Sequence, residues 1–184
     1  MTGQASSQDT PAPPPRREPA PAMAPDALPP EGEALARLLP ERLSDYSPEI
    51  GASIDEVVCT VAPGDVLPVC RTLKDAPDLS FRYLRLLTVV DYVEQDGELE
   101  VVYHLYSLEH HHKMVLKARV PDSRPALGSV TSVWRGANWF EREMHDLFGV
   151  EFDGHPDFRT LILPEGFDGL PGRKSYPLHD YDEW

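Results

Sequence analysis

Three segments rich in β-branched and aromatic residues follow one another between positions 81 and 120, separated only by short turns. They span 81–93, 98–108 and 113–120. The third alternates between an apolar and a basic face, with the apolar positions at Met114, Leu116, Ala118 and Val120. Strands joined by short turns pair antiparallel, and alternation indicates one buried face. The sequence therefore predicts an antiparallel meander that needs helices to cover its apolar face.

The segments before this meander supply two of those helices. Leucines at helical spacing predict a helix over 32–43, which Pro40 is expected to end or kink. The segment 54–63 has the composition of a strand, and Asp65 is expected to cap a helix over 66–75.

After the meander, residues 121–130 are expected to form a loop. A last helix is predicted over 138–148, with Asn138 as its cap and Gly149 as its C-terminal stop. The element order predicts an α+β fold in which helices pack on one face of a mixed, largely antiparallel sheet, followed by a long extended C-terminal tail.

The two ends of the chain differ from the segment 31–149, which is expected to form one folded domain. Residues 1–30 hold nine of the 20 prolines and no aromatic residue, so they are predicted to be a disordered proline-rich arm. Residues 150–184 lack periodicity but contain six aromatics, whereas disordered tails are poor in them. A tail that wraps a partner protein is favoured, ahead of packing on its own domain and of disorder.

Charge and composition exclude several classes of partner. The chain has 17 Lys and Arg against 31 Asp and Glu, a net charge of −14. Nucleic-acid binding requires clustered basic residues, and adsorption to anionic lipid does too, so neither is expected. No segment approaches the roughly 20 apolar residues that span a membrane. Any contact with a membrane is expected to go through another protein.

No catalytic, cofactor-binding or metal site is predicted in this chain. The triplet 110–112 contains three histidines, but it lies between two strands and lacks further ligands at a recognised spacing, so a hairpin turn is favoured over a metal site. The glycine-rich run 166–175 lacks the glycine and lysine spacing of a phosphate-binding loop. The two cysteines, Cys59 and Cys70, lie among apolar residues and are expected to be buried thiols.

Charged residues gather on the last predicted helix. Glu141 and Glu143 point about 200° apart on a helix, so they cannot converge on one substrate. Arg142 is spaced to pair with Asp146 at i+4. Two interpretations stay open. The charges either form a solvated helix face, or they form a network that fixes the start of the tail to its helix or to a partner.

The segments WFEREMHDLFGVEFDGHPDFRTLILP (139–164) and GFDGLPGRKSYPL (166–178) carry a recognisable signature. They resemble the 30 kDa-subunit family of respiratory complex I, which in the bacterial NADH–quinone oxidoreductase is the subunit designated C. The resemblance extends over about 31–178. The signature and interface residues that it implies are Glu141, Arg142, Glu143, Asp146, Leu147, Phe148, His155, Pro156, Arg159, Leu161, Arg173, Lys174 and Tyr176.

The sequence departs from the family pattern in one segment and at one further residue. The family usually has Gly-His-Pro-Leu-Arg-Lys-Asp where this chain has Gly-Leu-Pro-Gly-Arg-Lys-Ser at 169–175, and His145 stands where many members have Tyr.

The resemblance implies a non-catalytic subunit of the peripheral arm, held on the cytoplasmic side of the cell membrane by its complex. FMN and iron–sulfur clusters would belong to other subunits, which pass electrons from NADH to a quinone with coupled ion translocation. The tail would lie against the subunit designated D, which helps to form the quinone pocket and is called the quinone-pocket subunit below.

Two alternatives stay open. Membrane-bound nickel–iron hydrogenases and coenzyme-F420-type dehydrogenases contain a homologous subunit, so the electron donor is not determined by this chain. A free-standing enzyme that uses Glu143 or His145 as a general base is the alternative of another class.

Overall fold

The computed structural model describes residues 28–177. The helices are α1 (Pro30–Arg42), α2 (Val66–Asp75), α3 (Val93–Asp96) and α4 (Ala137–Phe148), with single 3-10 turns at η1 (Ser44–Tyr46) and η2 (Pro63–Asp65). The strands are β1 (Glu49–Ser53), β2 (Glu56–Thr60), β3 (Tyr83–Asp91), β4 (Glu98–Tyr106), β5 (Lys113–Pro121), β6 (Ala126–Gly128) and β7 (Glu151–Asp153). Residues 1–27 of the predicted disordered arm and the last two aromatics, Tyr181 and Trp184, lie outside the described residues. The arm is predicted to reach residue 30, but Pro30 already belongs to α1.

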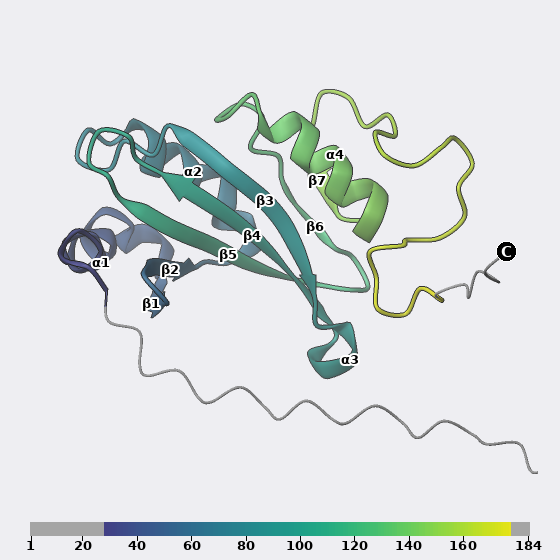
Figure 1. Cartoon of the computed structure of the whole chain (residues 1–184), viewed down its shortest axis with the longest axis horizontal. Helices are drawn as coiled ribbons and strands as arrows, with labels where there is room; N and C mark the ends of the chain where they lie inside the picture. Colours follow the sequence, from purple (N-terminus) through teal and green to yellow (C-terminus); the bar gives the residue numbers. More distant parts are fainter. Residues whose placement is uncertain (1–27, 178–184) are drawn as a thin grey trace, which may run out of the picture.

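The main sheet has five strands in the order β1-β2-β5-β4-β3 (Figure 1). Its neighbours pair antiparallel except for β2 and β5, which are parallel. In the meander, Val101 on the middle strand lies opposite Val89 and Ala118 on its two neighbours. The predicted meander and the α+β class with a mixed, largely antiparallel sheet are therefore confirmed.

Alternation along β4 separates the two faces of this sheet. Leu99, Val101, Tyr103 and Leu105 have no solvent exposure and lie in one core with apolar residues of α1, α2 and α4. The opposite face is covered by ion pairs, such as that of Lys117 Nζ with Glu100 Oε1 at 2.9 Å. One face thus packs against helices, and long charged side chains cover the other.

Two predictions in the N-terminal half differ from the structure. The segment 54–63 does contain one strand, β2, but this strand is shorter than predicted, because Ile54, with a φ of 59°, lies in the turn that joins β2 to the unpredicted strand β1. Most residues of β1 are exposed, so it carries no apolar alternation that would reveal it. Helix α1 continues two residues past Pro40, and the Leu43 N–H still bonds Leu39 O at 2.9 Å. Pro40 removes the one hydrogen bond that its own N–H would have made, and the helix ends two residues later.

Around α4 the structure adds a strand pair to the predicted loop and tail. Strand β6 lies inside the expected loop and pairs in parallel with β7, so Leu127 faces Phe152. Both side chains belong to the core. Helix α4 connects these strands, as Figure 1 shows. Gly136, and not Asn138, occupies its N-cap, whereas Gly149 ends the helix at a φ of 73° as predicted.

Candidate protein-interaction surface

Glu141 on α4 is a buried carboxylate with no solvent exposure. Its Oε2 accepts the Ser129 hydroxyl at 2.7 Å, and its Oε1 accepts the Val130 N–H at 2.7 Å. Burial raises the pKa of this carboxyl to about 7, although both hydrogen bonds act to lower it. Glu141 therefore fastens α4 to the segment after β6, and the interpretation of a solvated helix face is wrong for this residue.

His155 fixes the beginning of the tail against the first turn of α4. Its side chain has no solvent exposure. Nδ1 accepts the Asp157 N–H at 3.0 Å, so the ring proton lies on Nε2, which is 3.3 Å from Asn138 O. Burial lowers the pKa of the imidazole, which agrees with the neutral tautomer. The Nε2 atom also lies 3.9 Å from a carboxylate oxygen of Glu141.

Arg142 holds the next part of the tail through its backbone. Its Nε donates to Arg159 O at 2.7 Å, and its Nη2 donates to Thr160 O at 3.0 Å. No ion pair joins Arg142 to Asp146 in the part of the chain that the structure describes, so that predicted i, i+4 pair is wrong. A charge-assisted hydrogen bond to a backbone carbonyl stabilises more than an exposed ion pair within a helix. This difference explains why Arg142 binds the tail and not Asp146.

Asp146 binds the tail one turn further along α4. Its Oδ2 accepts the N–H of Leu161 at 2.7 Å and that of Ile162 at 2.9 Å. The aspartate is almost buried, and successive backbone N–H groups that point at one oxygen form an anion-binding nest. Together with Arg142, it confirms the interpretation of a charged network that fixes the tail to its own helix.

Arg159, whose carbonyl Arg142 holds, has an exposed side chain. Its guanidinium pairs with Asp157 at 2.7 Å, and this hydrogen bond lowers the pKa of the Asp157 carboxyl to about 2. Arg159 is therefore held beside α4 by its carbonyl, while its side chain points to solvent.

The end of the tail is attached through Arg173 and its neighbours. The Nε of Arg173 donates to Phe148 O at 2.6 Å, and its guanidinium also pairs with Asp122 beyond β5. The Lys174 N–H donates to Asp91 Oδ2 at 2.8 Å. Tyr176 stacks on Phe167 with ring centroids 6.3 Å apart. Residues 159–176 therefore lie along α4 and the edge of the meander.

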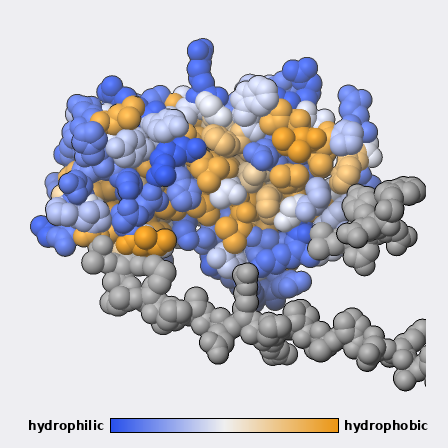
Figure 2. Space-filling view, viewed as in Figure 1, coloured by the Kyte–Doolittle hydropathy of each residue, from blue (hydrophilic) through white to orange (hydrophobic). Residues whose placement is uncertain are grey.

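Apolar side chains on α4 and on this attached tail stay exposed to solvent. The exposed fractions are 64% for Trp139, 55% for Ile162, 41% for Phe167 and 36% for Phe158. The rings of His145 and His155 flank Phe158 at 4.7 and 4.6 Å. Figure 2 shows apolar residues reaching the surface in this part of the molecule. We call these four residues the apolar surface. Its rigid support and exposure are typical of a protein-binding surface.

The remaining predicted residues have lesser roles in the fold. Leu147, Phe148 and Leu161 are half-buried, Pro156 is exposed, and the side chain of Glu143 makes no hydrogen bond within residues 28–177. Sequence reasoning missed Ser129, Asp91 and Asp122, whose partners are distant in the chain. Within the described range, no group of three or more His, Cys, Asp or Glu is placed to hold a metal ion. No helix there is long and apolar enough to cross a membrane.

Comparison with known proteins identifies the family of this α+β domain with its attached tail. Residues 59–182 match the family described as respiratory-chain NADH dehydrogenase, 30 Kd subunit. The chain belongs to this family, whose bacterial members are named as the C component of NADH–quinone oxidoreductase. It is 41% identical over 143 residues to the relative of Rhizobium etli that is designated C 2, covering 78% of this chain and 76% of the relative.

A mitochondrial relative and two solved structures extend the comparison. The iron-sulfur protein 3 of Candida albicans NADH dehydrogenase [ubiquinone] is 38% identical over 141 residues, which cover 77% of this chain and half of the relative. A trypsin-resistant fragment of Nqo5 superposes with a TM-score of 0.57 at 27% identity, covering 67% of this chain and 98% of the fragment. A chain of an archaeal membrane-bound sulfane sulfur reductase shares the fold, with a TM-score of 0.63 at 23% identity, over 79% of this chain and 86% of that one.

Proposed function

We propose that this chain is a non-catalytic peripheral-arm subunit of a proton-translocating NADH:quinone oxidoreductase, held on the cytoplasmic side of the membrane by its complex. In this role it scaffolds the quinone-reducing module beside the quinone-pocket subunit. Electrons pass from NADH through FMN and iron–sulfur centres of other subunits to the quinone. The chain itself contributes a binding surface.

One observation carries this proposal: α4 uses its charged residues to hold the tail. Arg142 and Asp146 bind backbone atoms of the tail, and Glu141 is directed into the core. These three side chains therefore do not converge on a cavity where a substrate could react. What the arrangement presents to solvent is the apolar surface, which includes Trp139 and Phe158.

The family membership supports the identity of the complex. The bacterial relatives are named as components of NADH–quinone oxidoreductases, and the sequence match spans most of their length. Docking of the apolar surface against the quinone-pocket subunit is our proposal for how this chain fits into such an assembly.

The test is affinity purification of the tagged full-length chain from native membranes, comparing the wild type with Trp139→Ala. The expected result is that the wild type co-purifies NADH-binding flavoprotein and iron–sulfur subunits. The variant should lose most of them while its stability changes by less than about 0.5 kcal/mol, as is usual for exposed positions. Leu108→Ala is the matched control, because Leu108 is 66% exposed but lies in the turn after β4.

Two outcomes would contradict the proposal. Co-purification of nickel-containing subunits would favour the hydrogenase alternative, and turnover of a substrate by the purified chain alone would favour the free-standing enzyme. A truncation that tests the tail should remove 158–184 and not 150–184, because Val150 and Phe152 have no solvent exposure and belong to the core. The shorter truncation should leave a folded domain that no longer joins the complex.

A further inference from the structure

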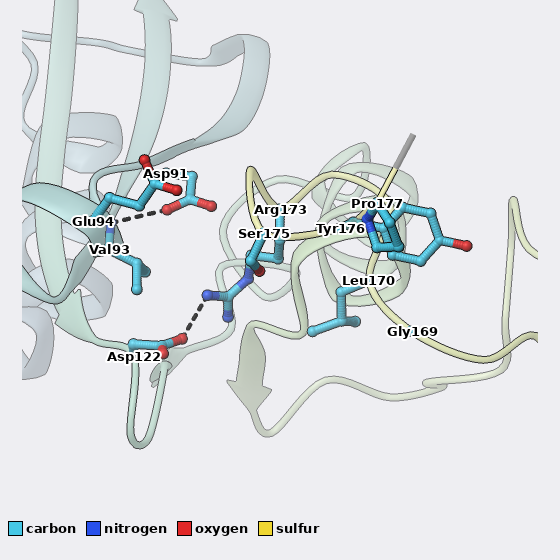
Figure 3. Close-up of a pocket in the computed structure, with 10 residues that line it drawn as sticks. All are labelled: Asp91, Val93, Glu94, Asp122, Gly169, Leu170, Arg173, Ser175, Tyr176 and Pro177. Atoms are coloured by element: carbon cyan, nitrogen blue, oxygen red, sulfur yellow. Dashed lines mark hydrogen bonds and ion pairs between the residues drawn. The ribbon is translucent and has the colours of Figure 1, made fainter. Parts of the chain in front are cut away.

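A cavity of about 390 Å³ lies between the tip of the β3–β4 hairpin and the end of the tail (Figure 3). The hairpin side contributes Asp91, Val93 and Glu94, and Asp122 follows β5. Figure 3 shows Arg173 reaching from the tail toward Asp122, with the apolar side chains of the tail on the opposite side. Those apolar residues are Leu170, Tyr176 and Pro177. The cavity therefore has one charged wall and one apolar wall.

Most of the charged groups in this cavity already have partners. Asp91 accepts the Val93 N–H through Oδ1 and the Lys174 N–H through Oδ2. Asp122 pairs with Arg173. The exception is Glu94, which is exposed and whose side chain makes no hydrogen bond or ion pair with any residue between 28 and 177.

The charge of the lining follows from these contacts. Three carboxylates and one guanidinium line the cavity, so the lining carries an excess of negative charge. Lys174 is a cation next to the lining, and its Nζ lies over the Tyr92 ring, 5.9 Å from the centroid. A positively charged group is thus the electrostatic complement of this cavity.

The apolar wall is held rigidly. A Cβ added at Gly169 would lie 2.7 Å from the Tyr176 ring, so the backbone and this ring are in close contact. Tyr176 is also supported by its stacking on Phe167. A preformed wall of this kind lowers the cost of ordering on binding.

We propose that this cavity binds a lysine or arginine side chain from a neighbouring subunit. The alkyl stem lies against Leu170 and Tyr176, and the charged end pairs with Glu94. Lysine and arginine combine an apolar stem with a cationic end, which matches the two walls. The inference rests on the proposed function, since it names the chemistry of one partner contact beside the apolar surface.

The test places a photoreactive residue in the exposed rim of the cavity. A full-length chain with Ser175→p-benzoylphenylalanine is expressed in its native host, the membranes are irradiated, and the cross-linked peptide is identified by mass spectrometry. The expected peptide comes from another subunit and contains Lys or Arg next to the cross-linked position. Adding Glu94→Gln should reduce the yield about two- to fivefold, the range expected for a partly exposed ion pair. Glu41→Gln, an exposed acid on α1, should leave it unchanged.

Three outcomes would overturn the inference: a cross-link to residues 178–184 of the same chain, a peptide without a basic residue, or a yield that Glu94→Gln does not change. A second probe, Trp139→p-benzoylphenylalanine, distinguishes a failure of the cavity inference from a failure of the proposed function. A partner cross-link at position 139 without one at 175 rejects only the cavity. No cross-link at either position rejects both.

Discussion

The carboxylate of Asp146 accepts the backbone N–H of Leu161 at 2.7 Å, across 15 residues of chain. The same oxygen accepts the N–H of Ile162 at 2.9 Å, so one nearly buried charge holds two successive residues of the tail. This contact replaces the ion pair with Arg142 that the helical spacing suggested.

The variant Asp146→Asn tests this contact. The amide oxygen of an asparagine can take the place of Oδ2, but it carries no charge and accepts these N–H groups more weakly, so we expect a loss of about 1 kcal/mol from the free energy of unfolding or of tail opening. Hydrogen exchange at Leu161 and Ile162 should become faster by a factor that matches this loss. Glu143→Gln removes a charge from the same helix without a described hydrogen bond and serves as the control. Unchanged exchange in Asp146→Asn would show that the carboxylate does not hold the tail.

Glu141 should make the free energy of unfolding depend on pH. Its pKa is about 7 in the folded chain and 4.5 for a free carboxyl, so the folded state binds the extra proton between these values. Folding stability therefore falls as the pH rises from 4.5 to 7, by up to about 3 kcal/mol. Glu141→Gln resembles the protonated acid and should remove this slope.

Chemical denaturation of the wild type and Glu141→Gln between pH 4.5 and 8 measures the effect. Histidines with a lowered pKa, His112 and His155, act in the opposite direction, because protonation of the unfolded chain below 6.5 favours unfolding. The contribution of His112 is present in both proteins. Because His155 Nε2 lies 3.9 Å from the Glu141 carboxylate, the difference between the two curves reports Glu141 together with its coupling to His155. A difference that stays constant with pH would mean that this carboxyl has an ordinary pKa.

Gly172 lies where the end of the tail touches α4 most closely. An added Cβ would lie 2.8 Å from two ring atoms of Phe148 and 2.9 Å from Leu147 O. Because a backbone oxygen cannot turn away, Gly172→Ala should cost about 1–3 kcal/mol and detach residues 166–177. Trypsin should then cleave faster after Arg173, as followed by mass spectrometry. Gly51→Ala, whose Cβ would meet nothing within 4 Å, should leave the cleavage rate unchanged.

The meander and α4 could be predicted from the sequence because their apolar residues have the periods of two and 3.6 that each element imposes. Strand β1 could not, since it is mostly exposed and its residues follow no apolar alternation. Its pairing with β2 depends on a turn at Ile54 in a backbone conformation that β-branched residues rarely adopt.

The site was predictable only at the level of which residues carry charge. Glu141, Arg142 and Asp146 could be singled out, but their partners could not, because a backbone N–H or C=O is supplied by any residue type. The bond from Asp146 to Leu161 therefore leaves no trace in the side chain at position 161. The one pairing that spacing did suggest, Arg142 with Asp146, is replaced by these backbone contacts.

The parallel pair of β6 with β7 has a mechanical consequence for α4. The helix is the connection between two paired strands, and Glu141 ties it again to Val130. Tension that a bound partner exerts on the tail at Leu161 passes through Asp146 into α4. From there it reaches a strand pair whose Phe152 is embedded in the core. A pull on the outermost segment would thus load the interior of the domain for as long as the hydrogen bonds between Asp146 and the tail hold.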